Sequence, residues 1–331
     1  MHIFTNPNYN FLRWRWHAVV VSWILILAGA GVIYTRGLAK GIEFAGGTSV
    51  IMQFDTTPSV EAVRDALNRN YPGGGQDAIV QTYGDASLRQ VMVRVPTVGA
   101  EQGASLSASA QNVETAVRKS ALGNFKVVGT EIVGPSVGAD LTQKGLSAFV
   151  LSLIGILGYI AFRYEFSFAV GAVVATLHDV LVTFAFLAFF RYDLTLNVIA
   201  ALLTVTGYST NDTIVIFDRV RENMRKMRRD SLNDVINLSI NQTLGRTVIT
   251  AGTALLSAIA LFLFGGEVLH GFAFTMIVGI ITGTYSSVFV AAAIVTFWRQ
   301  TKPSKLSTAP AEPVAAPAAR KSKSQRKARA S

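Results

Sequence analysis

The sequence predicts an α-helical membrane protein with six transmembrane helices and an inserted, ferredoxin-like α+β domain on the extracytoplasmic side. Two observations predict this class. Half of the 331 residues are hydrophobic and only 15% are charged, whereas soluble domains carry charge on about a quarter of their residues. The charged residues lie in segments that alternate with long apolar blocks, a pattern typical of membrane proteins.

The first apolar block, 18–35, is long enough to cross a bilayer, because a span needs about 20 mostly apolar residues. A cleaved signal peptide is the competing interpretation, but its apolar core usually has only about 7–15 residues. We therefore expect an uncleaved anchor. Five further spans are predicted after a long polar segment, at 144–162, 167–190, 195–217, 246–265 and 271–297.

Lysine and arginine residues orient the predicted bundle through the positive-inside rule. They gather before the first span, between the fourth and fifth spans, and after the sixth. Six spans place all three basic segments in the cytoplasm. The predicted organisation is a cytoplasmic N-terminus with the first helix (1–36), an extracytoplasmic α+β domain (37–138), a five-helix bundle (139–298) with a basic cytoplasmic loop (218–245), and a disordered basic cytoplasmic tail (299–331).

Composition excludes several classes of site. The chain has no cysteine, so disulfides, thiolate metal sites and cysteine nucleophiles are absent. Its four histidines are not at metal-ligand spacing, and no metal is expected. The net charge of +10 could indicate nucleic acid, but the basic residues crowd at the ends of apolar runs, where they set topology. No nucleic acid partner is expected.

The segment outside the membrane shows strand and helix patterns in the order β-α-β-β-α-β. Apolar runs bounded by turn residues predict strands, and apolar residues at helical spacing predict helices. This order is that of a ferredoxin-like sandwich, and the segment is large enough for a small core of its own. The strands are expected at 48–55, 77–83, 88–95 and 125–133, with helices at 58–71 and 105–122 and a turn at 84–85.

Ionisable side chains in the predicted spans need a reason, because charge inside a bilayer is costly. Asp179 lies near the middle of the third span, beside His178. Asp212 precedes Asp218 at the cytoplasmic end of the fourth span by six residues, or about 9 Å. Arg246 opens the fifth span at a similar depth, so a contact with Asp212 is geometrically feasible. An aspartate with an arginine nearby is the minimum equipment of a proton relay.

A purely structural role competes with this interpretation. A buried aspartate–arginine pair can lock two helices together, and an arginine near the surface can snorkel instead. Interhelical hydrogen bonding would explain His178 and Asp179 nearly as well. Gly279 and Gly283 form a small-xxx-small pattern on the sixth span, which mainly indicates close helix packing.

Two motifs resemble the SecD/SecF family of protein-export membrane proteins, in the resistance-nodulation-division superfamily. The run 207–223, GYSTNDTIVIFDRVREN, is similar to the family signature. The run 41–48, GIEFAGGT, resembles the GxDFxGG element at the base of the first exported domain, with Glu43 where Asp is usual.

Three further runs support the resemblance: LHDV at 177–180, LGRTVIT at 244–250 and GPSVGADL at 134–141. The resemblance extends over about 10–298, in the family's order. The residues of the two specific motifs are Gly207, Tyr208, Ser209, Asn211, Thr213, Gly41, Glu43, Gly46 and Gly47.

The resemblance implies a transport subunit rather than an enzyme. Such a subunit would use the proton gradient, with no other cofactor, to promote export of secreted polypeptides. Asp212 would carry protons and Arg246 would modulate it, with Asp179 and His178 as further members of the relay. The implied location is the bacterial inner membrane, and the implied partners are a SecD-like subunit, the SecYEG channel, YajC and YidC.

Two other functions stay open at this point. A small-molecule or lipid exporter of the same superfamily would share the half-bundle, but such proteins usually carry two halves in one chain. An intramembrane hydrolase could be built on Ser209 and His178, although no helical motif places them together. No nucleotide-binding motif indicates ATP as an energy source.

Overall fold

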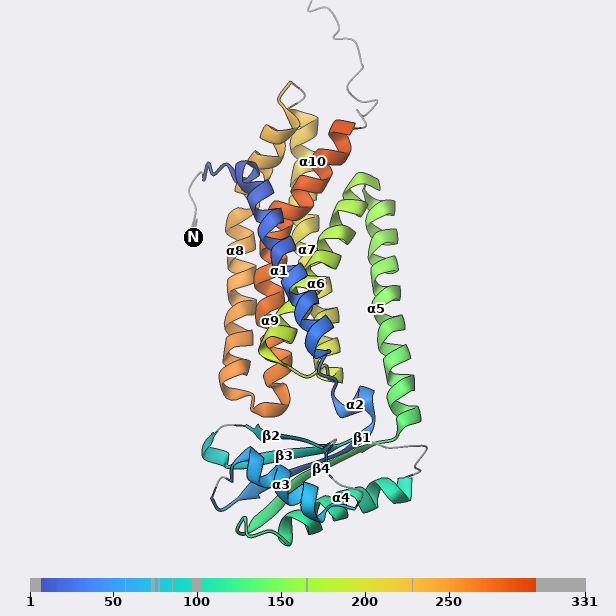
Figure 1. Cartoon of the computed structure of the whole chain (residues 1–331). Coiled ribbons are helices and arrows are strands. Elements are labelled where there is room, and N and C mark those ends of the chain that lie inside the picture. Colours follow the sequence, from blue (N-terminus) through green and yellow to red (C-terminus); the bar gives the residue numbers. More distant parts are fainter. Residues whose placement is uncertain are drawn as a thin grey trace, which may run out of the picture.

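The chain forms a helical bundle with a small sheet domain beyond one end of it (Figure 1). Our computed structural model describes residues 7–56, 58–72, 75–76, 78–84, 86–96, 103–164, 166–227 and 229–301. Within this described part, five helical segments are long and apolar enough to cross a membrane: Phe11–Arg36, Pro135–Arg163, Phe166–Phe190, Leu232–Phe264 and Val268–Trp298.

The fourth predicted span corresponds to α7 (Leu196–Lys226), which is not one of these five. Its length is sufficient, but its sequence contains the polar run STND and a charged C-terminal third. These residues lower its mean hydropathy. The helix therefore differs in composition from its neighbours, although it lies among them in the bundle (Figure 1).

Several helices extend beyond the predicted spans, because hydropathy marks the apolar part of a helix and not its ends. α5 (Pro135–Arg163) begins with a proline at its first turn, and α8 (Leu232–Phe264) is capped by the Ser231 side chain, which accepts from the Asp234 backbone N–H. Most of the predicted basic loop, 218–245, is therefore helical, because it consists of the end of α7 and the start of α8. Residues 227–231 alone connect the two helices.

The last predicted span is interrupted by one π-helical turn, η3 (Ser287–Ala291), between α9 (Glu267–Ser286) and α10 (Ala292–Thr301). Such insertions are frequently found at functional sites. α10 continues to Thr301, so the predicted tail begins later than expected. The rest of that tail, 302–331, lies outside the described residues.

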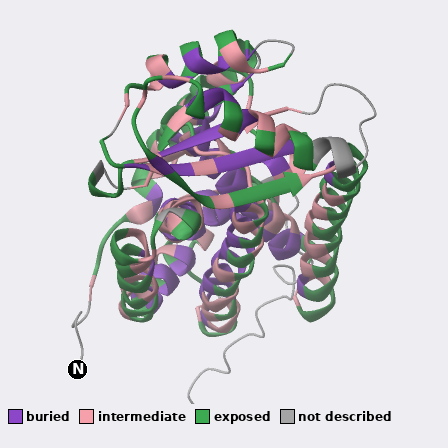
Figure 2. Cartoon of the chain, turned by 90° about the horizontal axis from the view of Figure 1, so that it is seen from below, coloured by how far each residue is buried: buried purple, intermediate pink, exposed green. Residues whose placement is uncertain are grey.

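Many exposed apolar residues lie on α1 (Arg15–Arg36) and α5. The ribbon is coloured as exposed along outer helix faces and as buried between the helices (Figure 2). α6 (Phe166–Phe190) lies at the centre and is the most buried of the apolar helices that precede α9. α7 packs closely against α9, where a Cβ added at Gly279 would lie 3.0 Å from the Val205 Cβ. The predicted packing role of the glycine pattern is consistent with this contact.

The N-terminal segment is bound to the start of α8 outside the apolar part of the bundle. The amide side chain of Asn241 accepts from the Tyr9 backbone N–H at 2.9 Å and donates to its carbonyl at 2.8 Å. Asn237 accepts from the Phe11 N–H at 2.9 Å. These bonds join residues more than 220 positions apart in the sequence.

The sheet domain has four antiparallel strands in the order β2-β3-β1-β4. Their bounds are β1 (Gly47–Phe54), β2 (Ile79–Tyr83), β3 (Gln90–Val95) and β4 (Phe125–Val133), with helices α3 (Val60–Asn70) and α4 (Gly103–Arg118). The predicted order of strands and helices is found, with two short additions, α2 (Ile42–Ala45) and η2 (Ala86–Leu88). Position 85 of the predicted turn lies outside the described residues.

Alternation along β1 separates the two faces of the sheet. Val50, Met52 and Phe54 are buried in the domain core together with residues of α3 and α4. Ser49 and Ile51 lie on the opposite face, which is turned toward the end of the bundle (Figure 1). The helices therefore cover one face of the sheet, and the bundle end faces the other.

Gly47 begins β1 with φ +132°, a value that residues with a Cβ rarely adopt. A Cβ at this position would also lie 2.5 Å from the Val95 carbonyl oxygen on β3. The second glycine of the GG pair in the GIEFAGGT motif is thus required by backbone geometry where the chain enters the sheet.

Candidate functional site within the helical bundle

The polar run of α7 makes contacts with three neighbouring elements. On the α6 side, the Thr210 hydroxyl lies 3.4 Å from that of Thr176, and both residues are buried. On the last span, the Thr213 hydroxyl lies 2.9 Å from that of Ser287, the first residue of the π-helical turn η3. The run therefore places hydroxyl groups in the interior of an otherwise apolar bundle.

Asp212 is the buried carboxylate of this run and is 7% exposed. Its Oδ1 accepts a hydrogen bond of 2.7 Å from the Thr247 hydroxyl on α8. Its Oδ2 is buried and has no partner among the described residues. An unpartnered carboxylate oxygen in this setting leaves an open position for a proton or a water molecule.

Arg246 does not approach Asp212 as an ion pair. No salt bridge of Arg246 within 4.0 Å is found in the described part of the chain, and its side chain is exposed. The neighbouring residue, Thr247, points inward instead and binds the carboxylate. Successive side chains on a helix point in directions about 100° apart. The similar depth of Arg246 and Asp212 in the sequence therefore could not predict that Thr247, rather than Arg246, faces the carboxylate.

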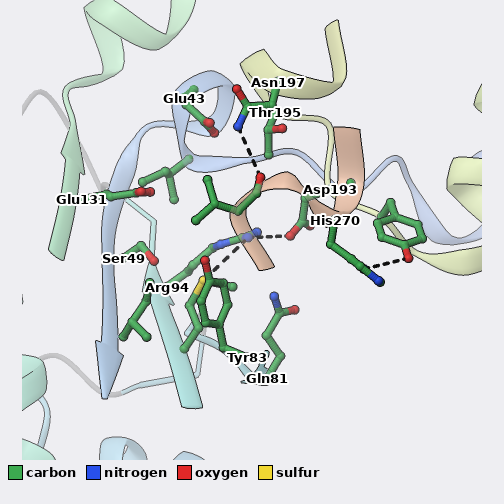
Figure 3. Close-up of a pocket in the computed structure, with 16 residues that line it drawn as sticks. Glu43, Ser49, Gln81, Tyr83, Arg94, Glu131, Asp193, Thr195, Asn197 and His270 are labelled. Atoms are coloured by element: carbon green, nitrogen blue, oxygen red, sulfur yellow. Dashed lines mark hydrogen bonds and ion pairs between the residues drawn. The ribbon is translucent and has the colours of Figure 1, made fainter. Parts of the chain in front are cut away.

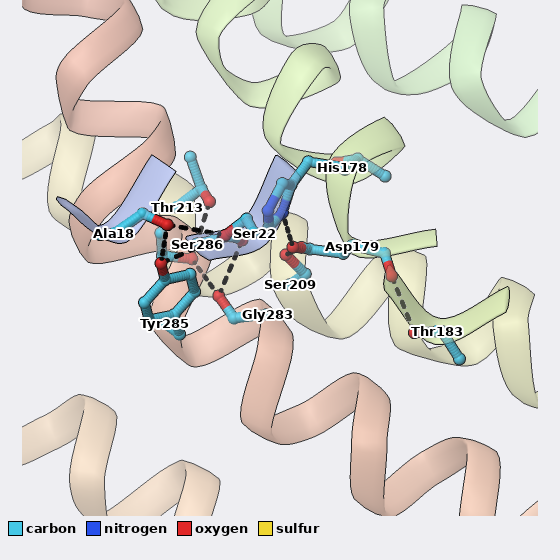
Figure 4. Close-up of polar contacts among 12 residues, drawn as sticks. Ala18, Ser22, His178, Asp179, Thr183, Ser209, Thr213, Gly283, Tyr285 and Ser286 are labelled. Carbon is cyan, nitrogen blue, oxygen red and sulfur yellow. Dashed lines mark hydrogen bonds and ion pairs between the residues drawn. The ribbon is translucent and has the colours of Figure 1, made fainter. Parts of the chain in front are cut away.

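His178 and Asp179, both predicted as members of the proton relay, form one hydrogen-bonded group with Ser209 of α7 (Figure 4). The Ser209 hydroxyl donates to Asp179 Oδ2 at 2.5 Å, and Asp179 Oδ1 lies 3.1 Å from His178 Nδ1. Asp179 is 1% exposed and His178 is 8% exposed. His178 Nε2 has no partner among the described residues.

The order of this group argues against the hydrolase hypothesis. In a nucleophilic triad, the histidine lies between the serine and the carboxylate, so that it can take the serine proton. Here Asp179 lies between Ser209 and His178. The structure brings together the three residue types that the sequence could not place, but in an order that does not let the imidazole activate the hydroxyl.

Tyr285 links this group to α1. Its ring stacks against His178 with centroids 6.4 Å apart, and its hydroxyl donates to the Ala18 carbonyl at 2.5 Å (Figure 4). The buried Ser22 hydroxyl lies 3.1 Å from the same phenol oxygen. Hydrogen bonds therefore join α9 to α1, and the ring stack of Tyr285 on His178 joins α9 to the group on α6 and α7.

The remaining motif residues are not members of these two hydrogen-bonded groups, although Tyr208 precedes Asp212 by only one helical turn of α7. Gly207 and Asn211 are on the exposed side of α7, and Tyr208 is half-buried. The GIEFAGGT motif lies at the junction with the sheet domain, where α2 carries Glu43, and not at the buried polar groups (Figure 1).

Sequence reasoning missed the contacts made by Thr247, Ser287 and Tyr285. Thr247 follows the arginine of the LGRTVIT motif directly, so the motif did mark the right turn of the helix. No signal identified Ser287, because an interior π-helical turn changes which side chains face the core without a marked change in composition.

Family models match two parts of the chain. One, described as protein export membrane protein SecD/SecF, C-terminal, matches residues 112–301. The other, described as the SecD/SecF GG motif, matches residues 31–58.

Relatives described as protein translocase subunit SecF align with most of the chain. The relative from Escherichia coli O157:H7 is 40% identical over 286 residues, which are 86% of this chain and 86% of the relative. The relative from Desulfurispirillum indicum is 42% identical over 296 residues, which are 87% of this chain and 91% of the relative.

Two solved structures have a similar fold. The crystal structure of SecDF, a translocon-associated membrane protein from Thermus thermophilus, has a TM-score of 0.79 and 33% identity over 89% of this chain. A SecDF structure in a super-membrane-facing form has a TM-score of 0.64 and 34% identity over 90% of this chain. The present chain spans only 39% and 40% of those two chains.

Proposed function

We propose that this chain, which belongs to the SecF family of protein translocase subunits, uses the proton gradient to promote export of secreted polypeptides. It is an integral membrane protein and an accessory subunit of the Sec translocase. The observation that carries the proton coupling is Asp212, a buried carboxylate in a bundle helix with one oxygen that has no hydrogen-bond partner among the described residues.

A proton path through this bundle needs groups that bind and release a proton at successive depths. Asp212 supplies one such group, and the pair of Asp179 and His178 supplies a second through its unpartnered Nε2. Hydroxyl groups on α7 and η3 lie beside them and can pass hydrogen bonds along. We assign Arg246 a modulating role, because it sits one residue from the Thr247 contact.

The outward side of α7 supports a SecD-like partner. Thr204, Gly207 and Asn211 lie on one exposed stripe, and no atom of the described residues lies within 4 Å of a Cβ added at Gly207. An asparagine facing lipid is unfavourable, and a small residue beside it lets another helix approach closely. This chain matches about two-fifths of the length of the SecDF chains. The remaining length of those chains is consistent with a SecD-like half as the partner.

The finer organisation is part of the same proposal. α7 would be the sixth transmembrane helix, and the sheet domain would be a ferredoxin-like unit outside the inner membrane, with both termini in the cytoplasm. The strand order β2-β3-β1-β4 supports this class of domain. SecYEG, YajC, YidC and secreted chains would be the further partners, and the proton gradient would be the only energy source.

The test of proton coupling compares Asp212→Asn with Thr247→Val. Asparagine can still accept from the Thr247 hydroxyl, but it cannot carry a proton. Valine removes the hydroxyl and leaves the carboxylate, at a cost of about 0.6–1.7 kcal/mol for one interhelical hydrogen bond. We expect Asp212→Asn to abolish gradient-driven export of a secreted reporter and Thr247→Val to retain most of it.

Export is measured by pulse-chase in cells with each variant at equal membrane abundance, with and without an uncoupler. Arg246→Lys should be milder than Arg246→Met, because lysine keeps the charge. Uncoupler-sensitive export at the wild-type rate in Asp212→Asn would show that the proton path lies elsewhere, with Asp179 as the next candidate.

The proposed topology is tested by single-cysteine labelling, since the chain has no native cysteine. Ala121→Cys in the sheet domain should react with an impermeant reagent in intact cells, whereas Asp230→Cys, between α7 and α8, should not. Both positions are exposed. The opposite pattern would invert the topology.

A further inference from the structure

The sheet domain is joined to the bundle by a short strap, the α6–α7 connection at 191–195. Its Leu194 accepts from the Gly41 N–H at 2.7 Å and donates to the Ala39 carbonyl at 2.8 Å. Its Asp193 forms an ion pair of 2.5 Å with Arg94 on β3, and the two side chains are 21% and 12% exposed. The open face of the sheet is thereby held against the bundle end.

A cavity of about 160 Å³ lies between this face and the bundle end (Figure 3). One row of the sheet crosses it, because Ser49 on β1 is paired in register with Arg94 on one side and with Glu131 on the other. Glu43 on α2 lies above this row, at the bundle side of the cavity (Figure 3).

The cavity holds an excess of negative charge. Three carboxylates line it against one guanidinium, and Asp193 already neutralises Arg94. In the described part of the chain, neither Glu43 nor Glu131 has a hydrogen-bond or ion-pair partner. Glu43 and Glu131 are therefore the carboxylates whose negative charge is not neutralised by a described side chain.

Ser49 gives an independent indication of a ligand. Its side chain is 2% exposed and lines the cavity, and its hydroxyl is buried without a partner among the described residues. Buried polar groups are nearly always hydrogen-bonded, so an orphaned hydroxyl between two charged side chains indicates an absent polar group.

We propose that this cavity binds the guanidinium or ammonium group of a basic polypeptide side chain, with Glu43 and Glu131 as counter-charges and the Ser49 hydroxyl as a hydrogen-bond acceptor. The inference rests on the proposed function, since a chain being exported supplies the side chain. The cavity volume of about 160 Å³ is below the roughly 300–1,000 Å³ of sites for drug-sized ligands. The cavity therefore suits the end of a single side chain.

Two other occupants fit the lining less well. A metal ion would need several carboxylate or imidazole ligands together, and the described residues contain no group of three or more that could hold one. A zwitterionic lipid headgroup would need a cation for its phosphate. Arg94 is the one lysine or arginine among the described lining residues, and it is already paired with Asp193.

The experiment measures binding of the peptide acetyl-Gly-Ser-Arg-Gly-Ser-amide to the full chain in phosphatidylcholine nanodiscs, by saturation-transfer NMR. The same peptide with citrulline in place of arginine keeps the shape and loses the charge. We expect the citrulline peptide to bind at least tenfold more weakly. Glu43→Gln and Glu131→Gln should each lower the affinity for the arginine peptide about fivefold, as expected for loss of one partly exposed charge pair.

Glu61→Gln is the matched control, because Glu61 is an exposed carboxylate of the same domain outside the cavity. It should leave the affinity unchanged, and so should Asp212→Asn, so that failure of proton coupling and failure of this site are separable. Equal binding of both peptides, or an equal loss in Glu61→Gln, would overturn the proposal. The proposal would also be overturned if phosphatidylethanolamine, added to the nanodisc, displaced the arginine peptide. That result would assign the cavity to a lipid headgroup.

Discussion

Replacing Gly279 with alanine tests how tightly α7 and α9 are packed. The added Cβ would lie 2.5 Å from Val205 Cγ1 and 3.0 Å from Val205 Cβ, whereas nine in ten real Cβ contacts are longer than 3.4 Å. Val205 is 1% exposed, and its β-branched side chain has few alternative rotamers in a helix. The two helices would have to separate by about 1 Å.

The expected cost combines two opposing effects. Overpacking of this kind costs about 1–3 kcal/mol, and replacing glycine by alanine in a helix returns up to about 1 kcal/mol. We therefore expect a net loss of about 1–2 kcal/mol, which corresponds to a melting temperature about 2–8 °C lower for a domain of this size. Gly252→Ala on α8 is the control, because its added Cβ would have no neighbour within 4 Å in the part of the chain that the structure describes.

The assay is the thermal loss of the monodisperse peak of the full chain in mild detergent. Val205→Ala combined with Gly279→Ala should recover part of the loss, since it removes the methyl groups that collide. Equal melting temperatures for Gly279→Ala and Gly252→Ala would refute the close-packing argument.

Two further predictions concern the sheet domain and its junction. Gly47→Ala should destabilise the domain by about 1–3 kcal/mol, because Gly47 has a positive φ and lies close to the Val95 carbonyl. Limited proteolysis should cleave the Gly47→Ala variant faster than the control Gly134→Ala, whose added Cβ meets no described atom within 4 Å. Arg94→Met should leave Asp193 without its partner and speed hydrogen exchange in the strap; unchanged exchange there would show that the ion pair does not hold the domain.

Patterns in the sequence predicted the elements whose signal is local. Apolar runs located the strands and the apolar helices, and the glycine pairs marked close contacts. Helix ends were missed where a helix leaves the apolar zone, as at Leu232, because polar residues form helix there without a hydropathy signal. The polar composition of α7 is explained by its neighbours, since its side chains contact three of them.

The candidate site was predictable only in part. Intramembrane charge identified Asp212, Asp179 and His178, but their partners depend on which face each helix turns inward. The depth of Arg246 was consistent with a contact that the rotation of α8 gives to Thr247 instead. The ion pair between Arg94 and Asp193 joins residues 99 positions apart, and no local pattern reports such a pairing.

α1 is held at both of its ends by hydrogen bonds to backbone groups. Asn237 and Asn241 bind the segment before it, and the strap at Leu194 binds the segment after it. A helix restrained in this way cannot slide along its own axis without breaking bonds at one end. Its angle can change when α8 and the strap, which hold its two ends, move relative to one another, and most of its length faces outward. A sideways displacement of α8 relative to the strap is therefore passed to α1 as a change of its angle, and not as a movement along its axis.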